Sequence, residues 1–294
     1  MTGVQTCALP ISEVLRCYPH STSASAVLYC RLPDWHEMRF LLDHLRPGDT
    51  FVDVGANVGV YTLLAAALPG VRCVAFEPST ESCARLVENV RLNGLTEVDV
   101  RRAAVGAESG EVAITVGRDS VNRVISTVPR SGESEPDPLE GPQPDGAPAG
   151  RAEWVPLTTL DEALAGVDRV TLVKIDVEGM EPAVLRGARE ILRRHSPAMI
   201  IERNDPVALG QALAEIGYAS FRYDPATRRT VPVDLSREPV HNVLALPQAP
   251  GEPPRAGAAA AAGRPGIPRQ PQPPRQPRPV SPRPGADGTT PAPR

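Results

Sequence analysis

The chain has 294 residues, of which 41% are hydrophobic and 22% charged, and its formal net charge is -4. This length allows one large domain or two small ones, and the slightly acidic balance disfavours a nucleic-acid binder. Aromatic residues make up only 4% of the chain, which argues against a platform that stacks the bases of single-stranded nucleic acid. The sequence has no apolar run of about 18 residues, so we expect no membrane-spanning helix.

The start of the chain reads as foreign sequence. Met1–Ile11 resembles the translation of a sequencing-library adapter, so we assign residues 1–12 to an artefact. Residues 13–49 are then expected to form a lead-in of a strand and a helix whose true beginning is missing. The five cysteines form no CxxC pair, which disfavours a zinc or dithiol site and is typical of a reducing compartment. We therefore expect a cytoplasmic protein.

Residues 50–247 alternate short apolar runs with amphipathic segments, the βαβ pattern of a mostly parallel sheet with helices on both faces. A short helix is expected before this region, over residues 35–45. In chain order, strands are predicted at 50–54, 72–76, 98–105, 111–116, 169–176, 198–202, 221–223 and 240–246. The helices between them are predicted at 57–68, 82–92, 182–195 and 206–216.

Two proline-rich stretches interrupt this pattern. Residues 129–150 hold six prolines among 22 residues, with Gly, Ser, Glu and Asp between them. Such a segment buries too little apolar surface to offset its ordering entropy, so we expect a flexible insert within the domain. Residues 248–294 are rich in Pro and Arg without a repeat, which predicts a disordered tail whose partner is unknown.

A glycine-containing loop follows the first strand of this region. The segment 51–59 reads FVDVGANVG, with Asp53, Gly55, Asn57 and Gly59 at the turn into a helix. Small residues let a ligand approach the backbone, and the helix start offers free N–H groups. A dinucleotide fingerprint needs glycine at positions 57 and 60. The chain has asparagine and valine there, so an NAD-dependent dehydrogenase is disfavoured.

An acidic residue ends the second strand. Glu77 lies 24 residues after Asp53, where a carboxylate can accept hydrogen bonds from the two hydroxyls of a ribose. Two acids at this loop suit a ligand that carries a sulfonium and an ammonium better than one that carries phosphates. Together with the glycines, they favour a nucleoside cofactor with an amino-acid part.

Three blocks of the sequence, the first of which contains these residues, resemble the FkbM-type methyltransferase family. The blocks are FVDVGANVGVYT with Phe76-Glu77-Pro78, then AAVG at 103–106, and LVKIDVEGME at 172–181 followed by VLRG and residues 197–202. The resemblance covers about residues 35–247. It implies a seven-stranded Rossmann-like sheet, S-adenosylmethionine as methyl donor, and often methylation of oxygen. It also implies cofactor-binding roles for Asp53, Gly55, Asn57, Gly59, Glu77, Ala103 and Ala104.

Four charged residues lie at or near the ends of the strands predicted at 169–176 and 198–202, where ligands of open sheets bind: Lys174, Asp176, Glu178 and Glu202. Methyl transfer to oxygen needs a base for the hydroxyl proton, and Asp176 or Glu178 is the candidate. Lys174, the only lysine, is expected to pair with Asp176. The alternative is that these residues only organise the loop. No ligand spacing identifies a metal, although Asp176 and Glu202 leave magnesium open.

The sequence therefore predicts a methyltransferase that modifies a hydroxyl of a small molecule or sugar, with no nucleic-acid partner and no membrane span. Two other classes stay open. One is a module that binds the cofactor without catalysis, and the other, less favoured, is a dehydrogenase.

Overall fold

The computed structural model describes residues 5–8, 13–17, 32–116, 124–126 and 151–248. The chain divides into two units, Met1–Gly263 and Arg264–Arg294, and every described residue belongs to the first. The predicted flexible insert, 129–150, and the predicted tail, apart from Gln248, lie outside the described residues. None of the helices within the described part is long and apolar enough to cross a bilayer.

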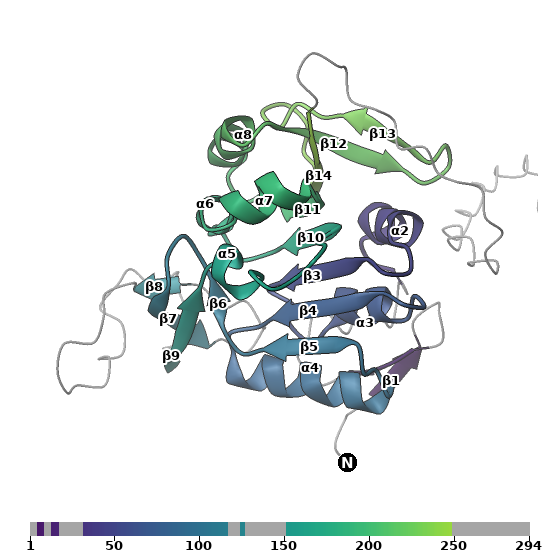
Figure 1. The fold of residues 1–294 in the computed structure, drawn as a ribbon, viewed down its shortest axis with the longest axis vertical. Helices are drawn as coiled ribbons and strands as arrows, with labels where there is room; N and C mark the ends of the chain where they lie inside the picture. Colours follow the sequence, from purple (N-terminus) through teal and green to yellow (C-terminus); the bar gives the residue numbers. More distant parts are fainter. Residues whose placement is uncertain (1–4, 9–12, 18–31, 117–123, 127–150, 249–294) are drawn as a thin grey trace, which may run out of the picture. The chain divides into compact units, whose positions relative to one another are not determined.

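An eight-stranded sheet forms the centre of the described structure (Figure 1). Five strands run parallel, in the order β5 (Val98–Arg101), β4 (Arg72–Phe76), β3 (Thr50–Val54), β10 (Leu172–Ile175) and β11 (Ala198–Glu202). Three antiparallel strands continue it, namely β14 (Asn242–Pro247), β12 (Tyr218–Asp224) and β13 (Arg229–Pro232). The predicted α/β class and the central strands are thus present.

The sheet has eight strands instead of the expected seven, and it is mixed, with five parallel strands followed by three antiparallel ones. The extra strand, β13, is a short edge strand that pairs only with β12. Its residues are exposed or half-buried, and Arg228, with φ 55°, turns the chain into it. A half-exposed edge strand of this kind needs no apolar run, so the sequence pattern did not mark it.

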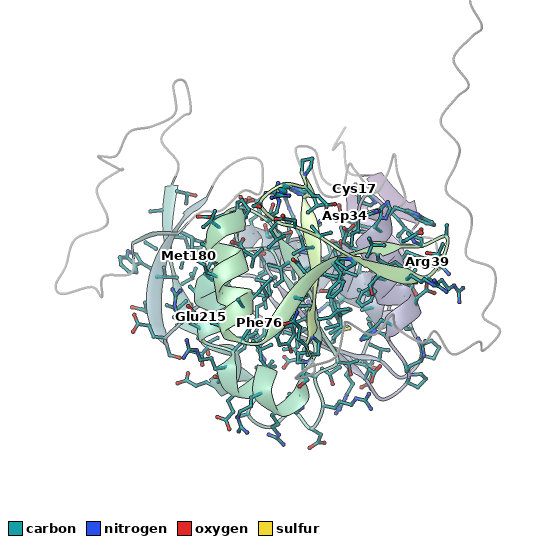
Figure 2. All side chains as sticks on the ribbon, turned by 90° about the horizontal axis from the view of Figure 1, so that it is seen from above. Cys17, Asp34, Arg39, Phe76, Met180 and Glu215 are labelled. Atoms are coloured by element: carbon teal, nitrogen blue, oxygen red, sulfur yellow. The ribbon has the colours of Figure 1, made fainter. Side chains whose placement is uncertain are left out.

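Helices cover both faces of this sheet. One face carries α2 (Trp35–His44), α3 (Val60–Ala66) and α4 (Thr80–Leu92); the other carries α5 (Leu160–Ala163), α6 (Glu181–Arg186), α7 (Arg189–His195) and α8 (Pro206–Glu215). Figure 2 shows purple and green helices on opposite sides of the strands. Strand alternation decides what each face receives: Val52 and Val54 join the core under α5–α8, whereas Asp53 contacts Thr62 of α3.

The predicted helix 182–195 is in fact two helices. α6 ends at Arg186 with Gly187 as its C-cap, and α7 begins at Arg189. A Cβ at Gly187 would lie 2.0 Å from the carbonyl oxygen of Gly106, so the chain passes too close to that backbone for any other residue. This packing against a distant loop is what interrupts the helix.

A second, four-stranded sheet lies beside the main one, in the order β6 (Ala104–Val105), β9 (Arg151–Thr158), β7 (Gly110–Val116) and β8 (Val124–Ser126) (Figure 1). The predicted strand 98–105 is split between the two sheets, because the chain leaves the main sheet after Arg101. Val112, Ile114 and Val155 form a small core of their own. A separate hairpin pairs β1 (Gln5–Ala8) with β2 (Val14–Cys17), and backbone N–H groups of β2 donate to the side chains of Asn89 in α4 and Asn93 at its C-cap.

Candidate functional site

A cavity of about 550 Å³ opens at the carboxyl ends of β3, β4, β10 and β11, where the main sheet meets the second sheet. Parallel strands expose free backbone groups and loops at this edge, which is the usual place for a ligand. Nine of the ten residues that the sequence proposed line this cavity. They are Asp53, Gly55, Asn57, Glu77, Ala103, Ala104, Lys174, Asp176 and Glu178.

The loop after β3 leaves no room for side chains at its first turn. Gly55 has φ +80°, and a Cβ there would lie 1.9 Å from the carbonyl oxygen of Asp176. Its N–H and that of Ala56 donate to the carbonyl of Phe76, at 3.0 and 2.9 Å. Asn57 is also left-handed, with φ 51°, and its buried Oδ1 has no partner among the described residues. The loop therefore offers an unused acceptor to the cavity.

Gly59 has a different role from the one expected. It does not line the cavity but caps the start of α3 with φ +96°. A Cβ at this position would lie 2.4 Å from Cδ1 of Leu86 on α4. The structure thus requires this glycine for the packing of α3 against α4.

Glu77 is held by the backbone on both carboxylate oxygens. Its Oε2 accepts from the N–H of Asn57 at 2.8 Å and its Oε1 from the N–H of Ser79 at 2.9 Å. Burial raises the pKa of Glu77 to about 7, although the two backbone donors favour the charged form. Each oxygen keeps acceptor capacity, and Glu77 lines the cavity, so the group can accept two further hydrogen bonds from a diol.

A buried ionic cluster lies between the sheet and α3. Asp53 and Lys174 are register partners on adjacent strands, and their side chains are almost fully buried. Thr62 donates to Asp53 Oδ2 at 2.6 Å, while Asp53 Oδ1 has no partner among the described residues. Lys174 Nζ donates to Asp176 Oδ2 at 2.8 Å and lies 4.9 Å from the ring centre of Tyr61.

The charges of this cluster stabilise each other. Burial alone would lower the pKa of Lys174, but the carboxylates of Asp176 and Asp53 outweigh it and raise that pKa. Burial likewise would raise the pKa of Asp176, yet the Lys174 ammonium holds it below its usual value. Burial raises the pKa of Asp53, and the Lys174 ammonium offsets this rise only in part. Lys174 therefore stays charged and keeps Asp176 ionised.

Asp176 also shares a hydrogen bond with Glu202, which ends the neighbouring strand β11. Burial and the adjacent Asp176 carboxylate raise the pKa of Glu202 to about 8, so at neutral pH Glu202 carries the proton between them. Asn204 Nδ2 donates to Glu202 Oε2 at 2.6 Å. We call Asp176 and Glu202 the carboxyl pair. Sequence reasoning treated Glu202 only as a magnesium ligand, because the contact depends on the β10–β11 register.

Glu178 lies two residues beyond Asp176, with φ 52°, followed by Gly179 with φ 98°. This left-handed pair turns the chain from β10 into α6. Glu178 lines the same cavity, and its carboxylate contributes to the raised pKa of Glu202. The two candidates for the base, Asp176 and Glu178, therefore lie in one cavity.

Several residues at the cavity escaped the sequence analysis. Asp34, at the start of α2, accepts from the Tyr61 hydroxyl at 2.9 Å, and both line the cavity. His241 precedes β14, and its Nε2 lies 3.6 Å from Glu202 Oε1. These residues reach the site only through the packing of α2 and the insertion of β14, for which the sequence carries no local signal. In the described part of the chain, no group of three or more His, Cys, Asp or Glu side chains forms a metal-binding cluster.

The other end of the cavity is small and apolar. Ala103, Ala104 and Gly106 line it from the main chain after β5, and Val112, Ile114 and Leu157 come from the second sheet. A flat, uncharged group fits this wall better than a charged one, because burying a charge there would lack compensating partners.

Comparison with known proteins matches residues 53–223, more than half of the chain, to the methyltransferase FkbM domain. Methyltransferase 1 of Beauveria bassiana (strain ARSEF 2860) is 28% identical over 147 residues, which cover 48% of this chain and 59% of that protein. The 31-O-demethyl-FK506 methyltransferase FkbM of Streptomyces tacrolimicus is 30% identical over 190 residues, covering 58% and 71%.

Among solved structures, methyltransferase FkbM from Methylobacillus flagellatus KT matches with a TM-score of 0.42 and 17% identity, covering 76% of this chain and 53% of that one. The chain thus spans less than two thirds of the fungal relative and of this solved chain.

Proposed function

Because the chain belongs to the FkbM methyltransferase domain family, we propose that it transfers a methyl group from S-adenosylmethionine to a hydroxyl of a small molecule or sugar. The observation that carries this proposal is one cavity that joins a nucleoside-type loop to the carboxyl pair. The name of the Streptomyces relative states an oxygen position as its methylation site, which favours oxygen as the acceptor atom here. Family membership leaves the dehydrogenase alternative without support.

The cavity residues fit S-adenosylmethionine. Glu77 offers two carboxylate oxygens to the ribose hydroxyls, and the wall of Ala103, Ala104 and Gly106 suits the adenine. Asp53 Oδ1 and Asn57 Oδ1 are buried acceptors without partners among the described residues, and they suit the ammonium of the amino-acid part. Gly55, which has no side chain, lets the loop backbone pass close to Asp176 beside these two acceptors. When bound, this cofactor supplies an electrophilic methyl group attached to a positive sulfur.

The chain's own task is to remove the proton of the acceptor hydroxyl as its oxygen takes the methyl group. An ionised Asp176 beside Lys174 is a weak base, because the ammonium lowers its pKa. When both of its carboxyl groups are ionised, the carboxyl pair is a stronger base, because its last proton is lost only at a pH of about 8. We therefore assign the proton acceptor to the carboxyl pair as a unit. Lys174 positions Asp176 and does not itself transfer a proton.

This assignment predicts the pH dependence of turnover. Below about pH 8 the pair retains one proton, so kcat/KM should rise about tenfold per pH unit and level off above pH 8. Glu202→Gln should lower the plateau by roughly 10²–10⁴-fold and abolish the rise, because only the weakly basic Asp176 remains.

The matched control is Glu178→Gln, which removes a carboxylate from the same cavity outside the pair. It should keep the rise near pH 8. The measurement is transfer of labelled methyl to an acceptor found by screening. A flat profile in the parent chain, or a larger loss with Glu178→Gln than with Glu202→Gln, would contradict the assignment. Cofactor binding without turnover on any acceptor would instead favour a non-catalytic module.

We also propose a cytoplasmic location. The cysteines that the structure describes in full are buried and form no disulfide, as is usual in a reducing compartment; they are Cys17, Cys73 and Cys83.

A further inference from the structure

Asp34, labelled in Figure 2, is the N-cap residue of α2 but does not cap it in the usual way. An N-cap aspartate normally accepts hydrogen bonds from the first backbone N–H groups of its helix. Asp205 does so at α8, where its carboxylate accepts from Val207 and Ala208 at 3.0 Å. The Asp34 carboxylate makes no such bond to the described backbone of α2. Its Oδ2 instead accepts from the Tyr61 hydroxyl at 2.9 Å, and both residues line the cavity. The acid is therefore directed at the cavity and not at its own helix.

A second aspartate–tyrosine pair, at the other end of α2, differs from this one. Asp43 Oδ2 accepts from the Tyr223 hydroxyl at 2.8 Å, and Arg39 donates to both oxygens of the same carboxylate, at 2.9 and 3.1 Å. This pair is not part of the cavity lining and fastens α2 to β12. The bond from Tyr61, by contrast, is the only hydrogen bond to the half-buried Asp34 carboxylate among the described residues. Asp34 therefore keeps acceptor capacity that a structural tie does not need.

Asp34 and the carboxyl pair belong to one cavity but come from different elements. Asp34 precedes α2, whereas Asp176 and Glu202 lie at the ends of β10 and β11. The contacts that connect them pass through the buried Tyr61 ring, whose centre lies 4.9 Å from Lys174 Nζ, and through Lys174, which donates to Asp176. A ligand at this end of the cavity therefore meets two separate acceptor groups, and it needs two donor groups to use both.

We propose that Asp34 binds the acceptor and selects for a second hydroxyl. The reacting oxygen loses its proton to the carboxyl pair as it takes the methyl group from sulfur. Meanwhile the Asp34 carboxylate accepts a hydrogen bond from another hydroxyl of the same molecule, and Tyr61 positions Asp34 for this contact. The acceptor is then a polyhydroxylated compound of the sugar or cyclitol class, and a simple alcohol is a poor substrate. This inference rests on the proposed function.

The experiment compares methyl glucoside with its monodeoxy analogues, each of which lacks one hydroxyl. Each compound is offered with labelled S-adenosylmethionine, kcat/KM is measured, and NMR of the product identifies the methylated position. Loss of one particular hydroxyl, other than the methylated one, should lower kcat/KM about 10–100-fold, the usual effect of a lost hydrogen bond to a charged group.

Variants of the chain assign that hydroxyl to Asp34. Asp34→Ala should lose a similar factor with methyl glucoside and should no longer distinguish it from the critical deoxy analogue, because variant and analogue remove the same bond. Asp34→Asn keeps an oxygen for Tyr61 but offers an amide N–H₂ to the cavity, so it should lose the discrimination as well. Tyr61→Phe keeps the ring beside Lys174 and removes only the bond to Asp34, so it should raise KM several-fold with a smaller change in kcat.

Asp43→Asn is the matched control, because it alters the aspartate–tyrosine pair of the same helix that lies outside the cavity lining. It should lower the melting temperature, since it also weakens the ion pair with Arg39, but keep the parental discrimination between methyl glucoside and the critical analogue. Binding of S-adenosylhomocysteine shows that each variant is folded.

Three results would overturn the inference: every hydroxyl other than the methylated one is dispensable in the parent chain, or Asp34→Ala keeps the parental discrimination, or Asp43→Asn loses it to the same extent. Methylation of none of these sugars by a chain that still binds S-adenosylhomocysteine would also overturn it, while leaving the cofactor assignment intact. Failure of the parent chain to bind S-adenosylhomocysteine at all would overturn the proposed function itself.

Discussion

Gly55→Ala tests whether the cavity loop is built as described. The new Cβ would lie 1.9 Å from the carbonyl oxygen of Asp176, and the backbone φ of +80° disfavours any side chain. The left-handed conformation costs roughly 1–2 kcal/mol. The two backbones must also separate by about 1 Å or more to reach ordinary contact. That movement strains the bond from the Asp176 N–H to the Val54 carbonyl, now 3.0 Å, at a further cost of about 1 kcal/mol.

The total loss should therefore be about 2–4 kcal/mol of unfolding free energy, or roughly 5–15 °C in melting temperature for a domain of this size. Turnover should fall about 10²-fold, because Asp176 moves away from its working position. Chemical denaturation and methyl-transfer assays measure the two effects.

Gly94→Ala is the matched control, since Gly94 has φ +62° and no heavy atom lies within 4 Å of the place that a Cβ would take. Gly94→Ala should lose only the part of the unfolding free energy that comes from the left-handed backbone, about 1 kcal/mol, and keep full activity. If both alanine variants were equally stable and equally active, the close approach of Gly55 to Asp176 would not exist in solution.

Two further variants examine the cofactor residue and the buried cation. Glu77→Ala should weaken binding of S-adenosylhomocysteine by roughly 1–3 kcal/mol in calorimetry, because it removes the group that accepts hydrogen bonds from the ribose hydroxyls. Equal affinity of the variant and the parent chain would contradict the ribose assignment. Lys174→Met should lower the free energy of unfolding by about 3–5 kcal/mol and reduce turnover as well, because Asp53 and Asp176 would remain buried without their cation. A Lys174→Met chain with parental stability and parental turnover would show that the ion pair contributes neither to the free energy of unfolding nor to catalysis.

The sequence predicted the central strands well because they are buried on both faces. Thr50–Val54, Arg72–Phe76 and Ala198–Glu202 have the bounds expected from their apolar runs. β9 was missed, since Arg151–Thr158 mixes Arg, Glu and Pro with its apolar residues and pairs with a strand of the second sheet. Its register comes from a distant partner and not from its own pattern.

The candidate site divides in the same way. Gly55, Glu77 and Asp176 were found because each follows directly on a recognisable strand. Asp34 and His241 were not, because only the packing of α2 and the antiparallel insertion of β14 bring them to the cavity. Glu202 was identified, but its contact with Asp176 follows from the neighbouring ends of β10 and β11.

The central claim is that this cavity holds S-adenosylmethionine, and calorimetric titration of the full chain with S-adenosylhomocysteine and, separately, with NAD tests it most directly. We predict saturable binding of S-adenosylhomocysteine and none of NAD, because Asn57 and Val60 stand where a pyrophosphate-binding loop needs glycine. Binding of NAD, or no binding of S-adenosylhomocysteine, would contradict the account.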